Sequence, residues 1–187
     1  MTDPADTEAR HQLMWASTLA GIAFGNAGCH APHGMSYSVS GLVKDFQPAG
    51  YPLGEPIVPH GMSVIVNAPS VFRITSTHSP DRHRDGARWL GADVSDIGDG
   101  EVGEALAQRI IAMMQATDMP SGLRALGYDT SDIAALVDGA LPQERLLANA
   151  PSTSTESYSR RCTSTPWPTG SQVAGYISRE NSTWPTG

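Results

Sequence analysis

Three histidines near glycines are the residues of this chain best suited to chemistry. His30 and His33 lie in the segment GNAGCHAPHGMSYSVSG, and His60 follows in PIVPHGMS. Neutral imidazole binds Zn, Fe, Cu and Ni, and a neighbouring glycine lets the backbone approach an ion closely. Residues i and i+3 of a helix share a face, which makes His30 and His33 candidates for one metal site.

Spacing alone leaves a second interpretation open, in which these histidines are hydrogen-bonded or capping residues at the surface. Pro32 lies between His30 and His33 and argues against a regular helix there, because proline lacks an N–H group and restricts the residue before it. A zinc hydrolase built on His30, His33 and His60 is a further alternative, but no general-base carboxylate accompanies them.

The remaining histidines and the first cysteine are expected to be structural. His78 and His83 lie among aspartates and arginines, a pattern typical of a solvated charged face. His11 is expected on the polar side of a helix. Cys29 has no orienting acid nearby, so we expect a small buried thiol and no nucleophile.

Composition limits the classes of partner and location. The chain has 187 residues, 40% of them hydrophobic, which suits one domain with a real core. Acidic residues outnumber basic ones by 19 to 12 and no cluster of Lys and Arg is present, so we expect no nucleic-acid partner. No apolar run approaches the roughly 20 residues that span a bilayer. The acidic start and two unrelated cysteines favour a reduced, cytoplasmic setting.

Periodicity predicts helices throughout the first 150 residues. The first runs from Thr7 to about Phe24, with apolar residues outside a single stripe, which predicts a helix buried on most sides. A short helix is expected at 35–44, and a Pro/Gly-rich loop at 45–61. The segment MSVIVNA that follows is interpreted as helix, because no partner strand is evident.

The second half of this region has clearer helix signals. Pro69 and Pro80 each suit the first turn of a helix, the latter capped by Ser79. An amphipathic helix follows, and one more begins near Asp129. The apolar stripe of the amphipathic helix consists of Val102, Leu106, Ile110, Met113 and Met114. Six or more helices joined by Gly/Pro loops predict an all-α helical bundle over residues 1–150.

Residues 151–187 differ in character, being rich in Ser, Thr, Pro and Gly, and are predicted to be a disordered tail. Back-translation of ESYSRRCTSTPWPT, residues 156–169, with a shift of two bases allows ELLASLYEHSVADW, an apolar-periodic helix. We therefore interpret the tail as the product of a frameshift near residue 151. A genuine linker is the alternative.

Three segments carry a resemblance to a known family. AGIAFGNAGCHAPHGMSYSVSGLVK, PIVPHGMSVIVNAPSVF and LPQER resemble, in order, the C-terminal half of iron-containing alcohol dehydrogenases. HGMSY, SGLVK and LPQER resemble the hydroxyacid–oxoacid transhydrogenase branch in particular. The resemblance covers about residues 7–150 and implies the helical, metal-binding domain of that fold.

The resemblance implies a ligand set. In that family an Asp and a His from one helix bind the ion together with two further histidines, which match His33 and His60. The Asp and first His should lie upstream, and no such pair precedes His30 here. His30 and Tyr37 match residues that line the active site. The resemblance implies Fe(2+) or another divalent ion such as Zn(2+), with NAD bound by an N-terminal α/β domain. No residue of this sequence is assigned to NAD or to a catalytic proton transfer.

The implied activity is hydride transfer between a small hydroxyacid or alcohol and an oxoacid or NAD, with 4-hydroxybutyrate and 2-oxoglutarate as substrates of the branch. With two ligands and the nucleotide domain missing, we expect the polypeptide alone to be inactive. A separate N-terminal half is an expected partner, and an exposed inter-domain face suggests a homo-oligomer. The alternatives are a non-catalytic helical module or a complementing subunit of a split enzyme. The resemblance gives the mitochondrial matrix as the alternative location.

Overall fold

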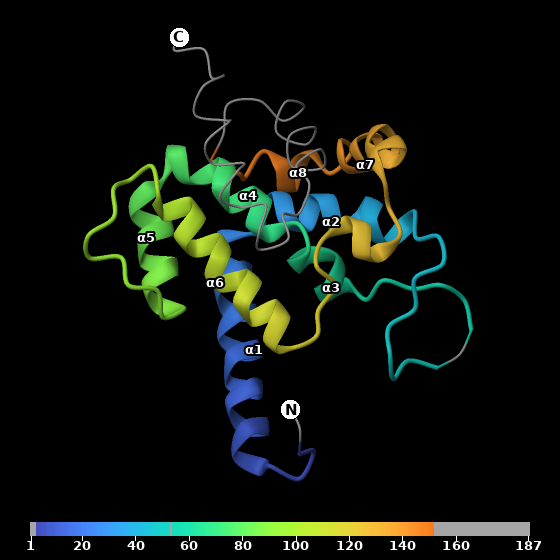
Figure 1. Ribbon diagram of the computed structural model, residues 1–187, viewed down its shortest axis with the longest axis horizontal. Coiled ribbons are helices and arrows are strands. Elements are labelled where there is room, and N and C mark those ends of the chain that lie inside the picture. Colours follow the sequence, from blue (N-terminus) through green and yellow to red (C-terminus); the bar gives the residue numbers. More distant parts are fainter. Residues whose placement is uncertain (1–2, 53, 152–187) are drawn as a thin grey trace.

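A computed structural model describes residues 3–52 and 54–151, and all regular secondary structure in these ranges is helical (Figure 1). This confirms the all-α prediction. The predicted tail lies outside the described residues, apart from Pro151. The α-helices are α1 (Thr7–Ala27), α2 (Ala31–Gly41), α3 (His60–Ile65), α4 (Ala68–Thr75), α5 (Pro80–Trp89), α6 (Val102–Ala116), α7 (Ile133–Ala140) and α8 (Glu144–Leu147), with 3-10 helices at Ser76–His78, Leu123–Leu126 and Thr130–Asp132.

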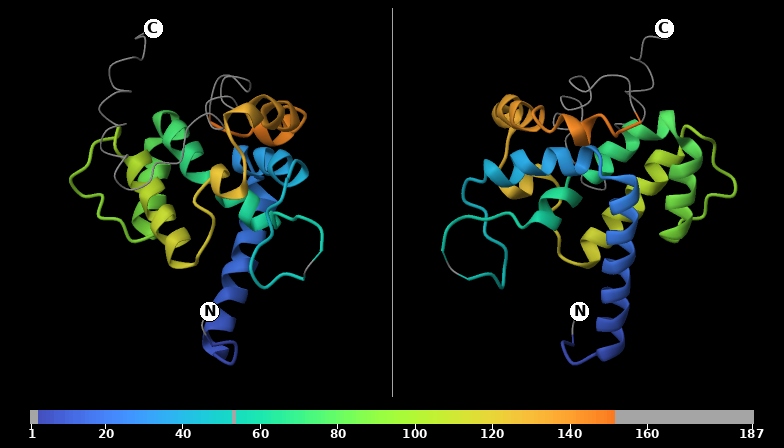
Figure 2. Two further views of the ribbon diagram at one scale, coloured as in Figure 1. Left: turned by 45° about the vertical axis from the view of Figure 1, so that its right-hand side comes forward. Right: turned by 180° about the vertical axis from the view of Figure 1, so that it is seen from behind.

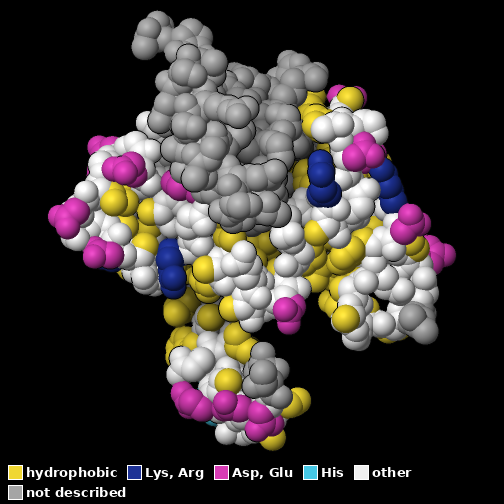
Figure 3. All heavy atoms as spheres, in the orientation of Figure 1, with side chains coloured by type: hydrophobic (Ala, Val, Ile, Leu, Met, Phe, Trp, Pro, Cys, Tyr) yellow, Lys and Arg dark blue, Asp and Glu magenta, His cyan; other side chains and the backbone are white. Residues whose placement is uncertain are grey.

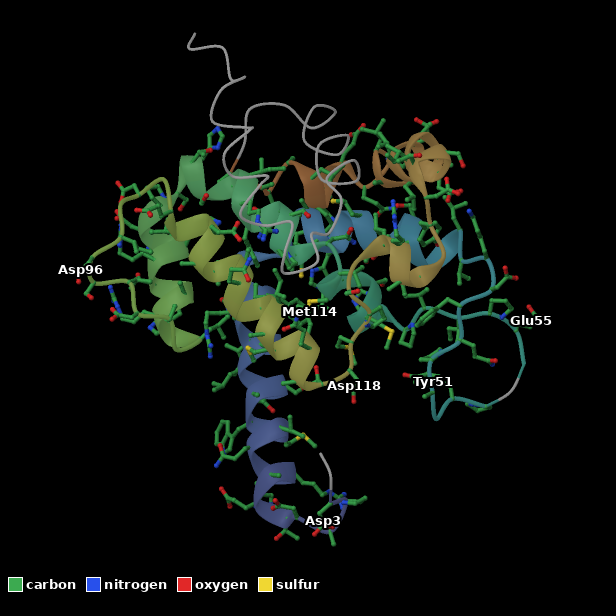
Figure 4. The ribbon with its side chains drawn as sticks, in the orientation of Figure 1. Asp3, Tyr51, Glu55, Asp96, Met114 and Asp118 are labelled. Atoms are coloured by element: carbon green, nitrogen blue, oxygen red, sulfur yellow. The ribbon has the colours of Figure 1, made fainter. Side chains whose placement is uncertain are left out.

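Helix α2 is central to one part of the bundle, because α3, α7 and α8 all pack against it. Helices α4 and α5 pack on α6. Two groups of buried side chains result: a larger one that includes Val39, Leu106 and Leu136, and a smaller one around Met35 and Leu147. Figure 4 shows Met114 of α6 directed into the interior, whereas Asp118 lies at the end of that helix.

Two glycines let α2 and its neighbours approach closely. A Cβ atom built on Gly34 of α2 would lie 2.9 Å from Cδ2 of Leu147 in α8. A Cβ atom on Gly139 of α7 would lie 2.8 Å from Cβ of Ser38 in α2. Such distances leave no room for a side chain, so the small residues set the spacing between these helices.

Helix α2 begins earlier than the sequence predicted. It starts at Ala31 instead of residue 35, and Pro32 lies in its first turn. The argument from Pro32 against a helix was wrong, because the N–H groups of a first helical turn have no intrahelical acceptor and proline loses nothing there. The helical interpretation of MSVIVNA is confirmed as far as Ile65, where α3 ends before α4 begins at Ala68.

Helix α1 differs most from its prediction. It was expected to be buried on most sides, yet none of its residues is buried. Figures 1 and 2 show α1 projecting away from the other helices, with the N-terminus at its far end. Its C-terminal end is anchored to the other helices, because Asn149 Nδ2 donates hydrogen bonds to the carbonyl oxygens of Ala27 and Cys29.

Smaller differences concern single positions. Met114 is buried, but its neighbour Met113 is half exposed and lies outside the core stripe of α6. Ser79 occupies the N-cap position of α5 without making the side-chain hydrogen bond of a cap. Asp129 does cap its helix, since its carboxylate accepts from the Ser131 N–H group. Among the described helices, even the longest lacks the apolar length needed to traverse a lipid bilayer.

Candidate metal centre

The structure brings His33 and His60 together from two different helices. His33 lies in the first turn of α2, and His60 is the first residue of α3. Because α2 and α3 pack on each other, the two imidazole centroids are 5.4 Å apart, with a tilt of 57° between the ring planes. Figure 4 shows Tyr51 and Glu55 on the loop that precedes α3.

The separation of these rings fits two ligands of one ion. With metal–nitrogen bonds of about 2.1 Å, two imidazole centroids at a tetrahedral angle lie about 5.2 Å apart. The observed 5.4 Å is close to that value. His60 is exposed and His33 is half-buried, so the pair opens toward solvent on one side. An ion and further ligands therefore have access to it.

The two histidines lie in identical pentapeptides, Pro-His-Gly-Met-Ser, at 32–36 and 59–63. In both, the serine hydroxyl donates to the histidine carbonyl: Ser36 Oγ to His33 O at 2.7 Å, and Ser63 Oγ to His60 O at 2.8 Å. Both serines are buried. The same local structure therefore presents each imidazole. This repeat is a signal that the sequence interpretation, which treated the two segments separately, missed.

Electrostatics favour the metal-binding form of the pair. Burial lowers the pKa of His33, and the neighbouring His60 imidazole lowers that pKa further. A depressed pKa keeps His33 neutral around pH 7, with a nitrogen lone pair available. A neutral imidazole can donate its nitrogen lone pair to a cation, so the form of His33 that burial favours is the form that binds metal.

His30 lies beside the pair and not within it. It occupies the N-cap position of α2, and its ring packs against Phe72 at 6.0 Å. Its Nδ1 atom is buried and has no hydrogen-bond partner among the residues that the structure describes. Burial is the main cause that lowers the pKa of His30, with His83 and then His33 adding to it. His30 lines an apolar cavity of about 440 Å³ whose wall includes Phe72, Trp89 and Leu106.

The prediction of a solvated face at His83 is wrong, because His83 is buried. Its Nδ1 atom lies 2.7 Å from the Ser79 carbonyl oxygen, which only accepts, so Nδ1 carries the proton. Its Nε2 atom lies 2.8 Å from Thr75 Oγ1. The His83 ring also packs edge-on against Phe72, 5.7 Å away. His83 thus supports Phe72, which in turn contacts His30.

The other sequence candidates are less enclosed. Tyr37 lies four residues after His33 on α2 and is exposed, so its phenol lies on the same helical face as His33. Cys29 is half-buried, less than the buried thiol that was expected. His11 and His78 are exposed.

Within residues 3–52 and 54–151, no group of three or more His, Cys, Asp or Glu side chains is gathered so as to hold an ion. The described residues therefore offer a pair of ligands. A structural zinc site takes four, which leaves positions for groups from elsewhere.

Comparison with known proteins shows the family to which the chain that carries this histidine pair belongs. Residues 1–158 match the model of the Fe-containing alcohol dehydrogenase family, C-terminal. A relative from Dictyostelium discoideum, named probable hydroxyacid-oxoacid transhydrogenase, mitochondrial, is 46% identical over 154 residues, or 82% of this chain and 28% of the relative. The Bos taurus protein named hydroxyacid-oxoacid transhydrogenase, mitochondrial, is 46% identical over 149 residues, or 80% of this chain and 32% of that protein.

A solved structure supports the same fold. The crystal structure of 1,3-propanediol oxidoreductase matches with a TM-score of 0.71 at 24% identity, over 85% of this chain and 38% of that one. The chain thus spans about a third of the length of these proteins. Both the family and the relatives are oxidoreductases. The chain belongs to the Fe-containing alcohol dehydrogenase family, to whose C-terminal part it corresponds.

Proposed function

We propose that this chain supplies half of the metal site of an alcohol dehydrogenase of the hydroxyacid–oxoacid transhydrogenase kind. His33 and His60 are the two ligands that it contributes. The observation that carries the proposal is the 5.4 Å approach of these rings, which arrive from separate helices at a spacing suited to one divalent ion. Family membership supplies the expectation of a metal, with Fe(2+) or Zn(2+) as the candidates.

The remaining ligands come, in this proposal, from a segment outside this sequence. The relatives are about three times as long as the region they share with this chain, which leaves ample polypeptide for a nucleotide domain and further ligands. Two neutral imidazoles without a carboxylate leave an ion under-coordinated and the site positively charged. The chain alone should therefore bind metal weakly and catalyse no hydride transfer.

Residues of this chain also suit a substrate site beside the metal. A bound divalent ion would draw electron density from a substrate oxygen and so assist loss or gain of hydride at its carbon. Tyr37 presents an exposed phenol on the face of His33. The Nδ1 atom of His30 has no hydrogen-bond partner within the described part of the chain, and a substrate hydroxyl or carboxylate oxygen could supply one.

The names of the relatives support hydroxyacids and oxoacids as substrates. Family membership supports NAD as a cofactor, which in this proposal binds outside this chain. The same names support a mitochondrial location, in preference to the cytoplasm.

Metal titration tests the proposal directly. Isothermal titration of the full chain with Zn(2+) should show one site that is weakened at least about tenfold by His33→Ala or by His60→Ala. Because both residues bind the same ion, the double variant should lose little more than either single one. His78→Ala, a change at an exposed histidine, is the matched control and should leave the affinity unchanged. Independent, additive losses would refute a shared ion.

A further inference from the structure

The cavity of about 440 Å³ is separate from the histidine pair, because neither His33 nor His60 lines it. Its wall is mainly apolar and comes largely from α4, α5 and α6. The large apolar side chains of the wall are Phe72, Trp89, Leu106 and Ile110. Liquid water takes about 30 Å³ per molecule, so about 15 water molecules would face a wall with few polar partners. An apolar ligand of suitable size would release them.

One face of α5 lines the cavity and changes from polar to apolar along its length. Ser79, Arg82, Gly86 and Leu90 follow i, i+3, i+7, i+11 spacing, so they lie on the same side of α5 and its caps. The rise from Arg82 to Leu90 is about 12 Å, at about 1.5 Å per residue. A ligand that lies along this face meets a hydroxyl and a guanidinium at one end and apolar groups at the other.

Arg82 is the residue of this face that can recognise an anion. Its side chain is exposed and makes no ion pair with another described residue. The two other arginines of α5 are each paired with an aspartate. Ser79 occupies the N-cap position without the side-chain hydrogen bond of a cap, so its hydroxyl also has a proton to donate. A carboxylate accepts hydrogen bonds from both groups.

The cavity favours an anionic ligand over a cationic one. The described residues that line it include no Asp or Glu, although acidic residues outnumber basic ones by 19 to 12 in the chain. Figure 3 shows Asp and Glu side chains at the outer edge of the molecule beside α5. Asp96, labelled in Figure 4, lies at that edge, in the loop that joins α5 and α6. A carboxylate beside Arg82 would therefore meet a cation and no acidic side chain of the described wall.

Gly86 leaves room in the wall of the cavity. It lies inside α5, where glycine is a poor helix former. A Cβ atom built on Gly86 would lie 3.6 Å from Cδ1 and Cδ2 of Leu106, which is ordinary van der Waals contact. A side chain would therefore fit at this position and would occupy space that the cavity now has.

We propose that this cavity binds a medium-chain carboxylic acid. The carboxylate accepts hydrogen bonds from Arg82 and Ser79, and the apolar chain lies along Gly86 toward Trp89. Trp89 is 77% exposed while it lines the cavity, so it lies where the cavity opens to solvent and a bound chain would cover part of it. The inference does not rest on the proposed function, because the acid does not use the histidine pair.

Isothermal titration of the full chain with octanoate, in the presence of EDTA, tests this site. Octanoate should bind at one saturable site, and butyrate at least about 20-fold more weakly, because it lacks four CH₂ groups. Arg82→Gln should weaken octanoate at least about tenfold and leave the binding of 1-octanol unchanged. Arg88→Gln is the matched control, since Arg88 is an exposed arginine on the opposite side of α5. No saturable binding of octanoate would overturn the proposal, as would equal losses in the two arginine variants.

Gly86→Leu tests the apolar end of the site. The added side chain should fill the cavity and weaken both octanoate and 1-octanol at least about tenfold. The free energy of unfolding in urea should not fall, because leucine favours a helix and its Cβ atom has room. Gly41→Leu adds the same side chain at an exposed helical glycine, where a Cβ atom meets nothing within 4 Å, and should leave binding unchanged. Unchanged octanoate binding by Gly86→Leu would contradict the proposed location.

The metal ligands separate this inference from the proposed function. His30 lines the cavity and lies one turn before His33, so an acid bound at the metal must be distinguished from one bound along α5. His33→Ala with His60→Ala should leave the octanoate affinity within about threefold of the wild type. Octanoate binding that requires Zn(2+), or that this double variant removes, would overturn a separate site. Octanoate bound at Arg82 by a chain that fails to bind Zn(2+) would refute the proposed function and leave this inference standing.

Discussion

Gly34→Ala tests whether α2 and α8 approach as closely as the structure indicates. Alanine favours a helix over glycine by about 1 kcal/mol, so a site with free space would gain stability. At Gly34 the new Cβ would lie 2.9 Å from Leu147 Cδ2 and 3.3 Å from its Cγ. Leu147 is itself buried among Ala31, Met35 and Ala140, so it has little room to turn away. Overpacking of this kind costs about 1–3 kcal/mol, and we expect a net loss of about 1 kcal/mol.

Gly61 provides the matched control, because it follows His60 as Gly34 follows His33, yet a Cβ there meets nothing within 4 Å. Gly61→Ala should therefore be neutral or stabilising by up to about 1 kcal/mol. Urea unfolding followed by circular dichroism measures both changes. Leu147→Ala should cost less in the Gly34→Ala background than in the wild type. Equal stability of the two glycine variants would refute the close contact, and with it the packing that orients His33.

Three other predictions concern stability and coding. The Tyr128 hydroxyl donates a buried hydrogen bond to the Val39 carbonyl oxygen at 2.7 Å, and burial raises the pKa of Tyr128 to about 12. Tyr128→Phe removes this bond and should lower the free energy of unfolding, measured in urea, by about 1–2 kcal/mol. Burial lowers the pKa of His83, despite the opposing hydrogen bond to the Ser79 carbonyl. Below about pH 6.5 the unfolded chain therefore binds more protons at His83 than the folded chain does. The melting temperature should fall as the pH drops from about 7.5 to 5.5. His83→Gln should reduce that fall and His11→Gln should not; equal falls would exclude His83 as a cause. Sequencing of the coding DNA should show that codons 156–169, moved two bases along, encode ELLASLYEHSVADW; any other product would refute the frameshift.

Local patterns predicted the helices that pack within the described chain. The apolar spacing of Val102, Leu106 and Ile110 identified α6, and these residues are buried. His83 was misassigned because the charges around it dominated the interpretation. The spacing of His83, Ala87 and Leu90, which is i, i+4, i+7, indicates an inward face, and the structure buries the first two.

The prediction that α1 is buried on most sides was wrong for the described chain, because none of its residues is buried. An apolar pattern on several sides of a helix indicates a helix that needs to be covered, and the described residues do not cover α1. The described residues also gather no complete set of metal ligands. Spacing alone left His30, His33 and His60 equivalent, because proximity between α2 and α3 depends on the course of the loop between them.

The central claim is that His33 and His60 bind the same ion. Imidazole ¹⁵N NMR of the full chain, titrated with Zn(2+), measures it residue by residue. The account predicts that the ring resonances of His33 and His60 shift together, with one apparent dissociation constant, while those of His11 and His78 stay in place. Shifts with separate dissociation constants, or shifts confined to His11 and His78, would contradict it.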